Sequence, residues 1–456
     1  MAPITKILLD ALLAVPLVSA FSISSAGNKV WKRSTPIPPT EDPFYQPPVG
    51  YESAAPGAIL ASRPVPSTLA AFQVFPLTIK AAYQLLYRTT NSLGGPEVTV
   101  TTVLIPYDAD PTKLISYQIA EDATYINCAP SYTLQTGSNT TYAGTGGIEV
   151  LLITAALNQG WIVNVPDWEG PNSTFIAGIQ AGQATLDSVR AALASGSITG
   201  VSSKAKVQMW GYSGGALASE FAAELQAGYA PEIPFIGTAI GGVTPNIANV
   251  YNTINEGLFA GLSAAGVLSL AKAYPDFNTY LQSILVPSTA AAFNAANERC
   301  FYADVVDYAY QNISTYFTNG PAILDAPEFT SIAPSGATMG THGTPSMPLF
   351  VYKAVNDEIS PIADTDALVT KLCSQGTKIT YIRDYFGEHF TQAATSAGAV
   401  IDFFKANFDG NSITECTTQD VYLDALLDPA ATLTLGAVLV AALLDVIGVP
   451  VGIAHF

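Results

Sequence analysis

A serine lies between glycines in the run Gly211-Tyr212-Ser213-Gly214-Gly215. Residues 207–210 before this run are mostly apolar and predict a strand, and residues 215–228 predict a helix. A Gly-x-Ser-x-Gly sequence between a strand and a helix forms a sharp turn that exposes the serine hydroxyl. The N–H of Gly214 and the helix N-terminus then face a developing oxyanion. With 36 glycines the motif can arise by chance, but its context favours Ser213 as a nucleophile.

A serine nucleophile needs a base, and the chain has only three histidines, His342, His389 and His455. His389 follows a predicted strand at residues 378–382 and precedes a predicted helix. Catalytic side chains of open sheets collect in such loops at the carboxyl ends of strands. His455 lies in an apolar tail, and His342 lies in a loop rich in Gly, Thr and Pro. We therefore expect His389 to be the base.

An acid that orients the histidine should lie between the serine and the histidine in the chain. Asp357 stands in the loop after a predicted strand at residues 349–354, and it is our first choice. Its role is to hold the imidazole tautomer and to stabilise the imidazolium. Glu358 is the neighbouring alternative, and Asp384 is a more distant one. Two further carboxylates are expected to start a helix instead, Asp364 and Asp366.

Short apolar strands alternate with amphipathic helices, so the fold class is α/β: a mostly parallel sheet flanked by helices. The expected strands are residues 98–105, 114–119, 160–165, 206–210, 235–240, 349–354 and 378–382. The expected helices are residues 181–195, 215–228, 364–374 and 391–408.

The chain divides into six predicted segments. We expect a signal peptide (1–20), a propeptide and N-terminal arm (21–70), a core in two parts (71–243 and 346–410), a helical cap insertion (244–345) and an apolar tail (411–456). Within the arm, residues 34–70 are rich in Pro and Ser and are expected to be extended, outside the core. The insertion is expected to be helical at 246–272 and 289–317. The tail has three interpretations: a membrane span, a lipid-anchor signal, or a flap packed over the site.

The N-terminus indicates export. Lys6 precedes an apolar stretch at residues 7–18 with small residues at 18–20, which is typical of a secretory signal. The pair Lys32-Arg33 resembles a propeptide cleavage site that would leave Ser34 as the mature N-terminus. Three triplets are glycosylation acceptors, at Asn139, Asn172 and Asn312. An even count of four cysteines suggests two disulfides, with three connectivities open.

The composition and net charge limit the classes of partner that the protein can bind. Hydrophobic residues make up 49% of the chain and charged residues only 12%, against about 25% in an average soluble domain. The formal net charge of −18 disfavours nucleic acid as a partner. The cysteines have no metal-ligand spacing, so we expect no metal, and we expect no cofactor. We also expect a monomer.

Separate motifs along residues 45–409 resemble, in order, those of the fungal secretory lipase family. They are Tyr117-Gln118, Glu121-Asp122-Ala123-Thr124, Cys128-Ala129-Pro130-Ser131-Tyr132, Pro166-Asp167, Glu169-Gly170-Pro171, the Gly-Tyr-Ser-Gly-Gly run, Tyr229-Ala230-Pro231-Glu232, Gly241-Gly242, Asp357-Glu358 with Pro361, and Glu388-His389.

This resemblance implies an α/β-hydrolase with a helical cap that acts on lipid or ester acyl groups, and it assigns Ser213, Asp357 and His389 as the triad. It places the oxyanion donors at Asp122 and Gly214. A side-chain contribution from Asp122 requires a protonated carboxyl with a raised pKa. The resemblance also implies two disulfides, Cys128 with Cys300 and Cys373 with Cys416. From Tyr422 onward the chain departs from the family pattern.

Three functions are compatible with these residues. The first is a secreted lipase or esterase that works through an acyl-enzyme on Ser213 and meets its substrate at a lipid–water interface. The second is a tailoring esterase or acyltransferase that acts on a secondary metabolite. The third is a non-catalytic protein on a hydrolase fold, which predicts a broken triad, whereas all three triad residues are present.

Overall fold

The computed structural model describes residues 35–73, 75–422 and 429–446. The predicted signal peptide, the pair Lys32-Arg33 and His455 lie outside these residues.

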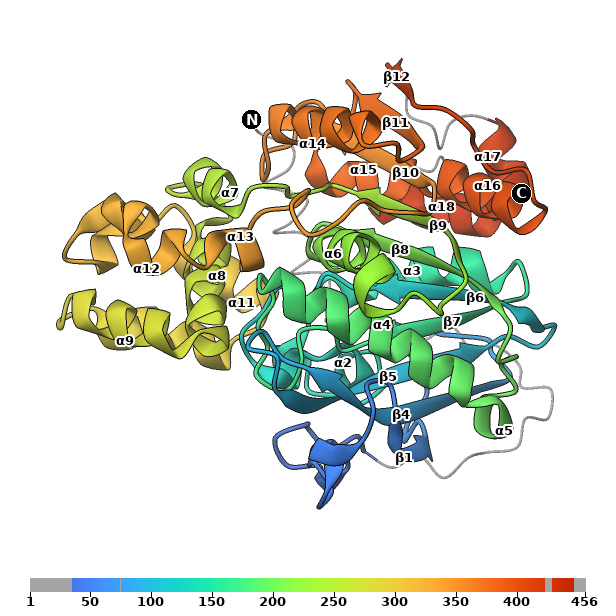
Figure 1. The fold of residues 1–456 in the computed structure, drawn as a ribbon, viewed down its shortest axis with the longest axis horizontal. Coiled ribbons are helices and arrows are strands. Elements are labelled where there is room, and N and C mark those ends of the chain that lie inside the picture. Colours follow the sequence, from blue (N-terminus) through green and yellow to red (C-terminus); the bar gives the residue numbers. More distant parts are fainter. Residues whose placement is uncertain (1–34, 74, 423–428, 447–456) are drawn as a thin grey trace.

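A ten-stranded sheet forms the centre of the molecule (Figure 1). Its order is β1-β4-β5-β7-β6-β8-β9-β10-β11-β12, parallel from β7 to β12 and antiparallel among β1, β4, β5 and β7. The strands are β1 (Ile59–Pro64), β4 (Ala81–Thr90), β5 (Pro96–Ile105), β6 (Asp110–Gln118), β7 (Trp161–Pro166), β8 (Lys206–Tyr212), β9 (Phe235–Gly241), β10 (Leu349–Ala354), β11 (Ile379–Asp384) and β12 (Thr417–Val421). The prediction of a mostly parallel sheet is confirmed.

Two expectations about the N-terminal part are wrong. The predicted strand at residues 98–105 is not the first strand of the sheet, because β4 precedes it in the chain and pairs with both β1 and β5. The arm also contributes to the core: β1 pairs with β4 at the sheet edge, and Leu69 is 2% exposed. An edge strand has a neighbour on only one side and tolerates proline, so its composition resembled that of a loop.

Helices cover both faces of the sheet. One face packs against α4 (Gly178–Ala194) and α6 (Gly214–Tyr229), and the other against α3 (Gly146–Leu157) and α16 (Ala397–Phe408). Each face has its own large cluster of buried apolar side chains. The remaining core helices are α2 (Pro130–Thr133), α5 (Gly196–Thr199), α14 (Ile362–Ser374) and α15 (His389–Thr395).

The segment between β9 and β10 is helical and lies to one side of the sheet (Figure 1). It is broken into shorter helices than the sequence pattern predicts. These are α7 (Ile247–Ile254), α8 (Ala260–Ala273), α9 (Pro275–Ile284), α10 (Ala290–Asn294), α11 (Phe301–Tyr308), α12 (Pro327–Thr330) and α13 (Ala333–Gly336). We call the segment 244–345 the helical insertion.

The apolar tail forms α17 (Pro429–Leu435) and α18 (Ala437–Val446), which are separated by Gly436 at φ 85°. Leu435, Leu439 and Leu443 are buried in the same cluster as residues of α3 and α16. In residues 35–73, 75–422 and 429–446, no helix has the length and apolar character needed to cross a membrane.

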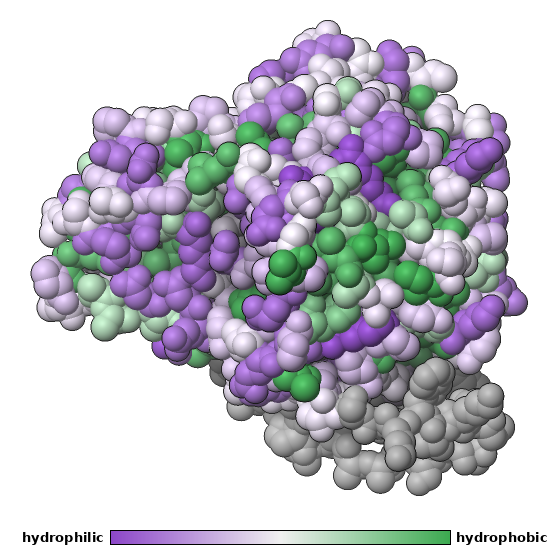
Figure 2. Space-filling model, turned by 60° about the horizontal axis from the view of Figure 1, so that its bottom comes forward, coloured by the Kyte–Doolittle hydropathy of each residue, from purple (hydrophilic) through white to green (hydrophobic). Residues whose placement is uncertain are grey.

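The surface mixes hydrophilic and hydrophobic residues, as Figure 2 shows for one face, with a hydrophobic patch near the middle of the body. This mixture follows from a composition with few charged residues.

Candidate active site

Ser213 occupies the turn between β8 and α6 with φ 53° and ψ −119°, a conformation that L-residues rarely adopt. Two glycines allow the sharp turn. A Cβ on Gly211 would collide with the carbonyl of Gly215, and a Cβ on Gly215 would collide with the carbonyl of Gln118. The backbone N–H of Ser213 donates to the carbonyl of Gly241 at 2.9 Å. The turn therefore holds the hydroxyl beyond the end of the strand.

A chain of hydrogen bonds leads from this hydroxyl into the protein. Ser213 Oγ lies 2.8 Å from His389 Nε2, and His389 Nδ1 lies 2.7 Å from Asp357 Oδ2. Because a carboxylate only accepts, Nδ1 carries the proton, and Nε2 of the neutral imidazole accepts from the serine. His389 is the first residue of α15 and is 2% exposed.

Asp357 lies in the loop after β10, and several donors surround its carboxylate. Oδ1 accepts from the N–H groups of Ile359 at 2.9 Å and Ser360 at 2.8 Å. Burial by itself would raise the pKa of Asp357, but His389 and the ammonium of Lys353 hold that pKa well below its usual range. The carboxylate therefore stays ionised across the neutral range.

The other candidate acids have different partners. Glu358 Oε2 accepts from the backbone N–H of His389 at 2.8 Å, so it braces the histidine without contacting its ring nitrogens. Asp384 accepts from the N–H of Phe386 at 2.7 Å, as a turn residue does. The remaining alternatives also lie elsewhere: Asp364 accepts from Asn249, Asp366 accepts from Tyr381, and His342 pairs with Glu224.

Asp122 follows β6, with φ 48° and a carboxyl group beside Gly214. Its Oδ1 is buried and has no hydrogen-bond partner within the described residues. Burial raises the pKa of Asp122 to about 7, although His389 lowers it in part. In the described part of the chain no hydrogen bond engages the backbone N–H of Asp122 or of Gly214.

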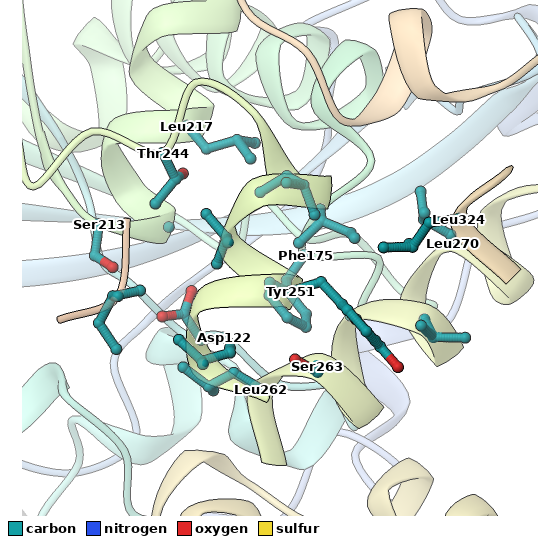
Figure 3. A pocket seen from close by; sticks show the side chains of 18 of the residues that line it. Asp122, Phe175, Ser213, Leu217, Thr244, Tyr251, Leu262, Ser263, Leu270 and Leu324 are labelled. Atoms are coloured by element: carbon teal, nitrogen blue, oxygen red, sulfur yellow. The ribbon is translucent and has the colours of Figure 1, made fainter. Parts of the chain in front are cut away.

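An apolar cavity that is partly open to solvent has Ser213, Gly214 and Asp122 among its lining residues. Its walls come from the core and from the helical insertion. The core contributes Phe175, Ile176, Leu217 and Ile359, and the insertion contributes Ile247, Val250, Ile254, Leu262, Val267, Leu270, Leu324 and Phe329. In Figure 3, Ser213 and Asp122 lie on one side of the cavity, and Leu270 and Leu324 lie on the opposite side.

Sequence reasoning missed some residues that hold the site. Glu149 of α3 accepts from the N–H of Ala120 at 3.0 Å and from Tyr117 Oη at 3.0 Å, so it fixes the chain just before Asp122. Tyr212 donates its hydroxyl to the carbonyl of His389. Glu149 lies on a different element from the residues that it supports, and no local pattern signals such a contact.

Two disulfides join distant segments in the pairing that the family resemblance implies. Cys128–Cys300 ties the loop after β6 to the helical insertion, and Cys373–Cys416 ties the end of α14 to the segment before β12. In the described part of the chain, no group of three or more His, Cys, Asp or Glu residues is arranged to hold a metal ion.

The sheet order, the elbow at Ser213 and the hydrogen-bonded Ser–His–Asp chain together define the class of α/β-hydrolases. A family model described as "Secretory lipase" matches residues 134–416. The chain belongs to the secretory lipase family, as the sequence motifs predict, and is a carboxylic ester hydrolase.

Named relatives agree with this assignment. Lipase A of Arthroderma benhamiae is 42% identical over 431 residues, which cover 92% of this chain and 90% of the relative. The trichothecene C-3 esterase of Fusarium sporotrichioides is 37% identical, covering 85% and 89%. The crystal structure of Candida antarctica lipase A in its closed state superposes with a TM-score of 0.81 at 30% identity, covering 90% of this chain and 96% of that chain.

Proposed function

We propose that this protein is an exported lipase or esterase in which Ser213 is the nucleophile, His389 the general base and Asp357 the acid that orients it. The observation that carries the proposal is the continuous chain Ser213–His389–Asp357 at the end of an apolar cavity. In this arrangement Ser213 attacks, His389 moves the proton and Asp357 remains charged.

The reaction follows from the positions of these groups. Ser213 Oγ attacks the ester carbonyl while His389 Nε2 takes its proton, and the backbone N–H groups of Asp122 and Gly214 donate to the oxyanion. The intermediate then expels the alcohol, which receives the proton from His389, and leaves an acyl-enzyme. Water activated by the same histidine releases the acid and restores the serine.

The lining of the cavity favours an apolar acyl group over a polar one. Its lining is apolar apart from a few hydroxyls and Asp122, and an alkyl chain that enters it leaves water, which contributes about 0.8 kcal/mol for each buried CH₂ group. Most of the lining side chains come from the helical insertion, so we assign this insertion the role of a cap. Binding at a lipid–water interface is consistent with such a cap.

Export and glycosylation belong to the same proposal. The two disulfides are typical of an oxidising compartment. Asn139 and Asn172 are exposed, which suits glycosylation. Asn312 is half-buried and its amide donates to Glu256 Oε1 at 2.5 Å, so a glycan there would share the nitrogen that makes this bond.

A second candidate is an esterase or acyltransferase that acts on a secondary metabolite. It is favoured by the relative that is named a trichothecene C-3 esterase. Such an enzyme would prefer one acetylated alcohol, or transfer its acyl group to an alcohol, and would show little dependence on longer acyl chains.

The test combines a variant with a substrate series. Ser213→Ala should reduce kcat on p-nitrophenyl esters by about 10⁴-fold or more, because it removes the attacking atom. The wild type should show kcat/KM rising from acetyl to medium-chain esters as the cavity fills. Full activity of Ser213→Ala contradicts the mechanism. A sharp preference for acetyl esters of one metabolite, or efficient alcoholysis, favours the second candidate.

A further inference from the structure

A lysine that is completely buried contacts the acid of the proposed triad. Lys353 lies on β10 and is 0% exposed. Its Nζ lies 2.7 Å from Asp357 Oδ2, the same oxygen that lies 2.7 Å from His389 Nδ1. Lys353 and His389, which can both carry a positive charge, therefore contact the same carboxylate oxygen of Asp357. The other ring nitrogen of His389 contacts Ser213 Oγ.

A second hydrogen bond fixes where the lysine head lies. Lys353 Nζ donates to the carbonyl of Val243 at 2.9 Å, just beyond the end of β9. Ser360 Oγ also donates to this carbonyl, at 3.2 Å. The ammonium thus joins the end of β9 to the loop that carries Asp357. An ammonium buried without a counter-charge would cost several kcal/mol, so its position beside Asp357 is a specific arrangement.

We propose that Lys353 is a positioning residue of the triad, whose buried positive charge opposes the gain of a second positive charge on His389 through their shared contact with Asp357 Oδ2. This inference rests on the proposed function of Ser213, His389 and Asp357. Without the lysine, protonation of His389 would create a neutral pair with Asp357. With the lysine, Asp357 is already paired, and the same protonation adds an unbalanced positive charge to a buried site.

The other charged groups around the site are retained when the lysine is removed, so a variant isolates its effect. Glu358 braces the backbone of His389, and Asp122 faces the histidine from the loop after β6. Three more titratable groups lie around this site: Asp364, Tyr212 and Asp384. Burial lowers the pKa of Lys353 and Asp357 raises it, which fits an ammonium that depends on this carboxylate.

The experiment measures kcat/KM against pH for the full-length protein on a soluble short-chain ester. Lys353→Met keeps the apolar length of the side chain and removes the charge. The acid limb of the profile should move to higher pH by about one unit, because a unit charge a few ångströms away acts on a buried site. Lys405→Met, at a surface lysine 3.9 Å from Asp402, is the matched control and should leave the limb unchanged.

A second variant separates charge from hydrogen bonding. Lys353→Gln retains a neutral donor in place of the ammonium, and its acid limb should also move upward. It carries the test if the methionine variant does not fold. An acid limb that stays at the wild-type pH in a folded variant overturns the proposal. If neither variant folds, the lysine has a purely structural role, and the proposal is overturned as well. If Ser213→Ala is inactive while the limb does not move, only this inference fails; an active Ser213→Ala refutes the proposed function itself.

Discussion

Two buried aspartates lie close to the Ser213–His389 pair, and they differ in the donors around them. Asp357 receives two backbone N–H groups, the imidazole of His389 and the ammonium of Lys353. Asp122 has a buried Oδ1 without any partner in the described structure. Burial pushes the pKa of both carboxyls upward, but only Asp122 follows it, to about 7, whereas the donors hold the pKa of Asp357 low. Burial alone therefore does not decide whether a carboxyl is charged, because the number of donors can outweigh it.

The largest effect is expected from a substitution of Asp357, the ionised one of the two aspartates. Asp357→Asn should lower kcat by about 10³- to 10⁴-fold, because an amide presents a donor to His389 Nδ1 and stabilises the wrong tautomer. Steady-state kinetics on a soluble ester measures this loss. Asp384→Asn is the matched control, since an amide oxygen can still accept from the N–H of Phe386, and its activity should stay within about threefold. A large loss in Asp384→Asn with an active Asp357→Asn would reverse the assignment.

Asp122, the aspartate with the raised pKa, sharpens the comparison through its pH dependence. Asp122 is protonated below about pH 7 and ionised above it, and a carboxylate beside the oxyanion donors repels the developing negative charge. We expect wild-type kcat to fall as pH rises from about 7 to 9. Asp122→Asn keeps a neutral group of the same shape and keeps the backbone N–H, so it should be about two- to tenfold more active than the wild type at pH 9. Equal falls in both proteins would show that this carboxyl does not titrate in that range.

The smallest expected effect concerns stability and extends the comparison to carboxyls far from the site. Burial raises the pKa of Glu97 to about 8, and its Oε1 has no partner among the described residues. The folded protein keeps this proton above pH 4.5, where the unfolded chain releases it, so the free energy of unfolding falls as pH rises from about 4.5 to 8. Thermal unfolding at pH 5 and pH 8 should show the lower midpoint at pH 8.

A neutral substitution isolates the contribution of Glu97. In Glu97→Gln the loss of stability between pH 5 and pH 8 should shrink by at least about 1 kcal/mol, since each pKa unit of a shift contributes about 1.4 kcal/mol. Glu232→Gln is the control, because the Glu232 side chain is 57% exposed and pairs with Arg190 at the surface. That substitution should change the pH dependence by less than about 0.5 kcal/mol. A loss of stability in Glu97→Gln as steep as in the wild type would indicate that Glu97 is ionised in the folded protein.

Local patterns in the sequence were sufficient for the elements that are regular and buried. Each of the seven predicted strands matches a strand of the sheet, and most residues of these strands are buried, which is why their apolar runs stood out. The sequence also singled out Ser213, since only glycines fit around its turn, and it favoured His389, since three histidines left few choices. These inferences depend only on residues that are close together in the chain, and the sequence shows such residues directly.

Only the tertiary structure decided the features that depend on distant residues. It distinguished the positions of Asp357 and Glu358, adjacent in sequence, by placing one against the imidazole and the other against the backbone of His389. It placed β1 on the sheet edge through its pairing with β4, and it brought the carbonyl of Val243 and the carboxylate of Asp357 to the same ammonium of Lys353. Whether a carboxyl is charged depends on donors that arrive from several elements at once, so the sequence named the chemistry of this site and the fold set its electrostatics.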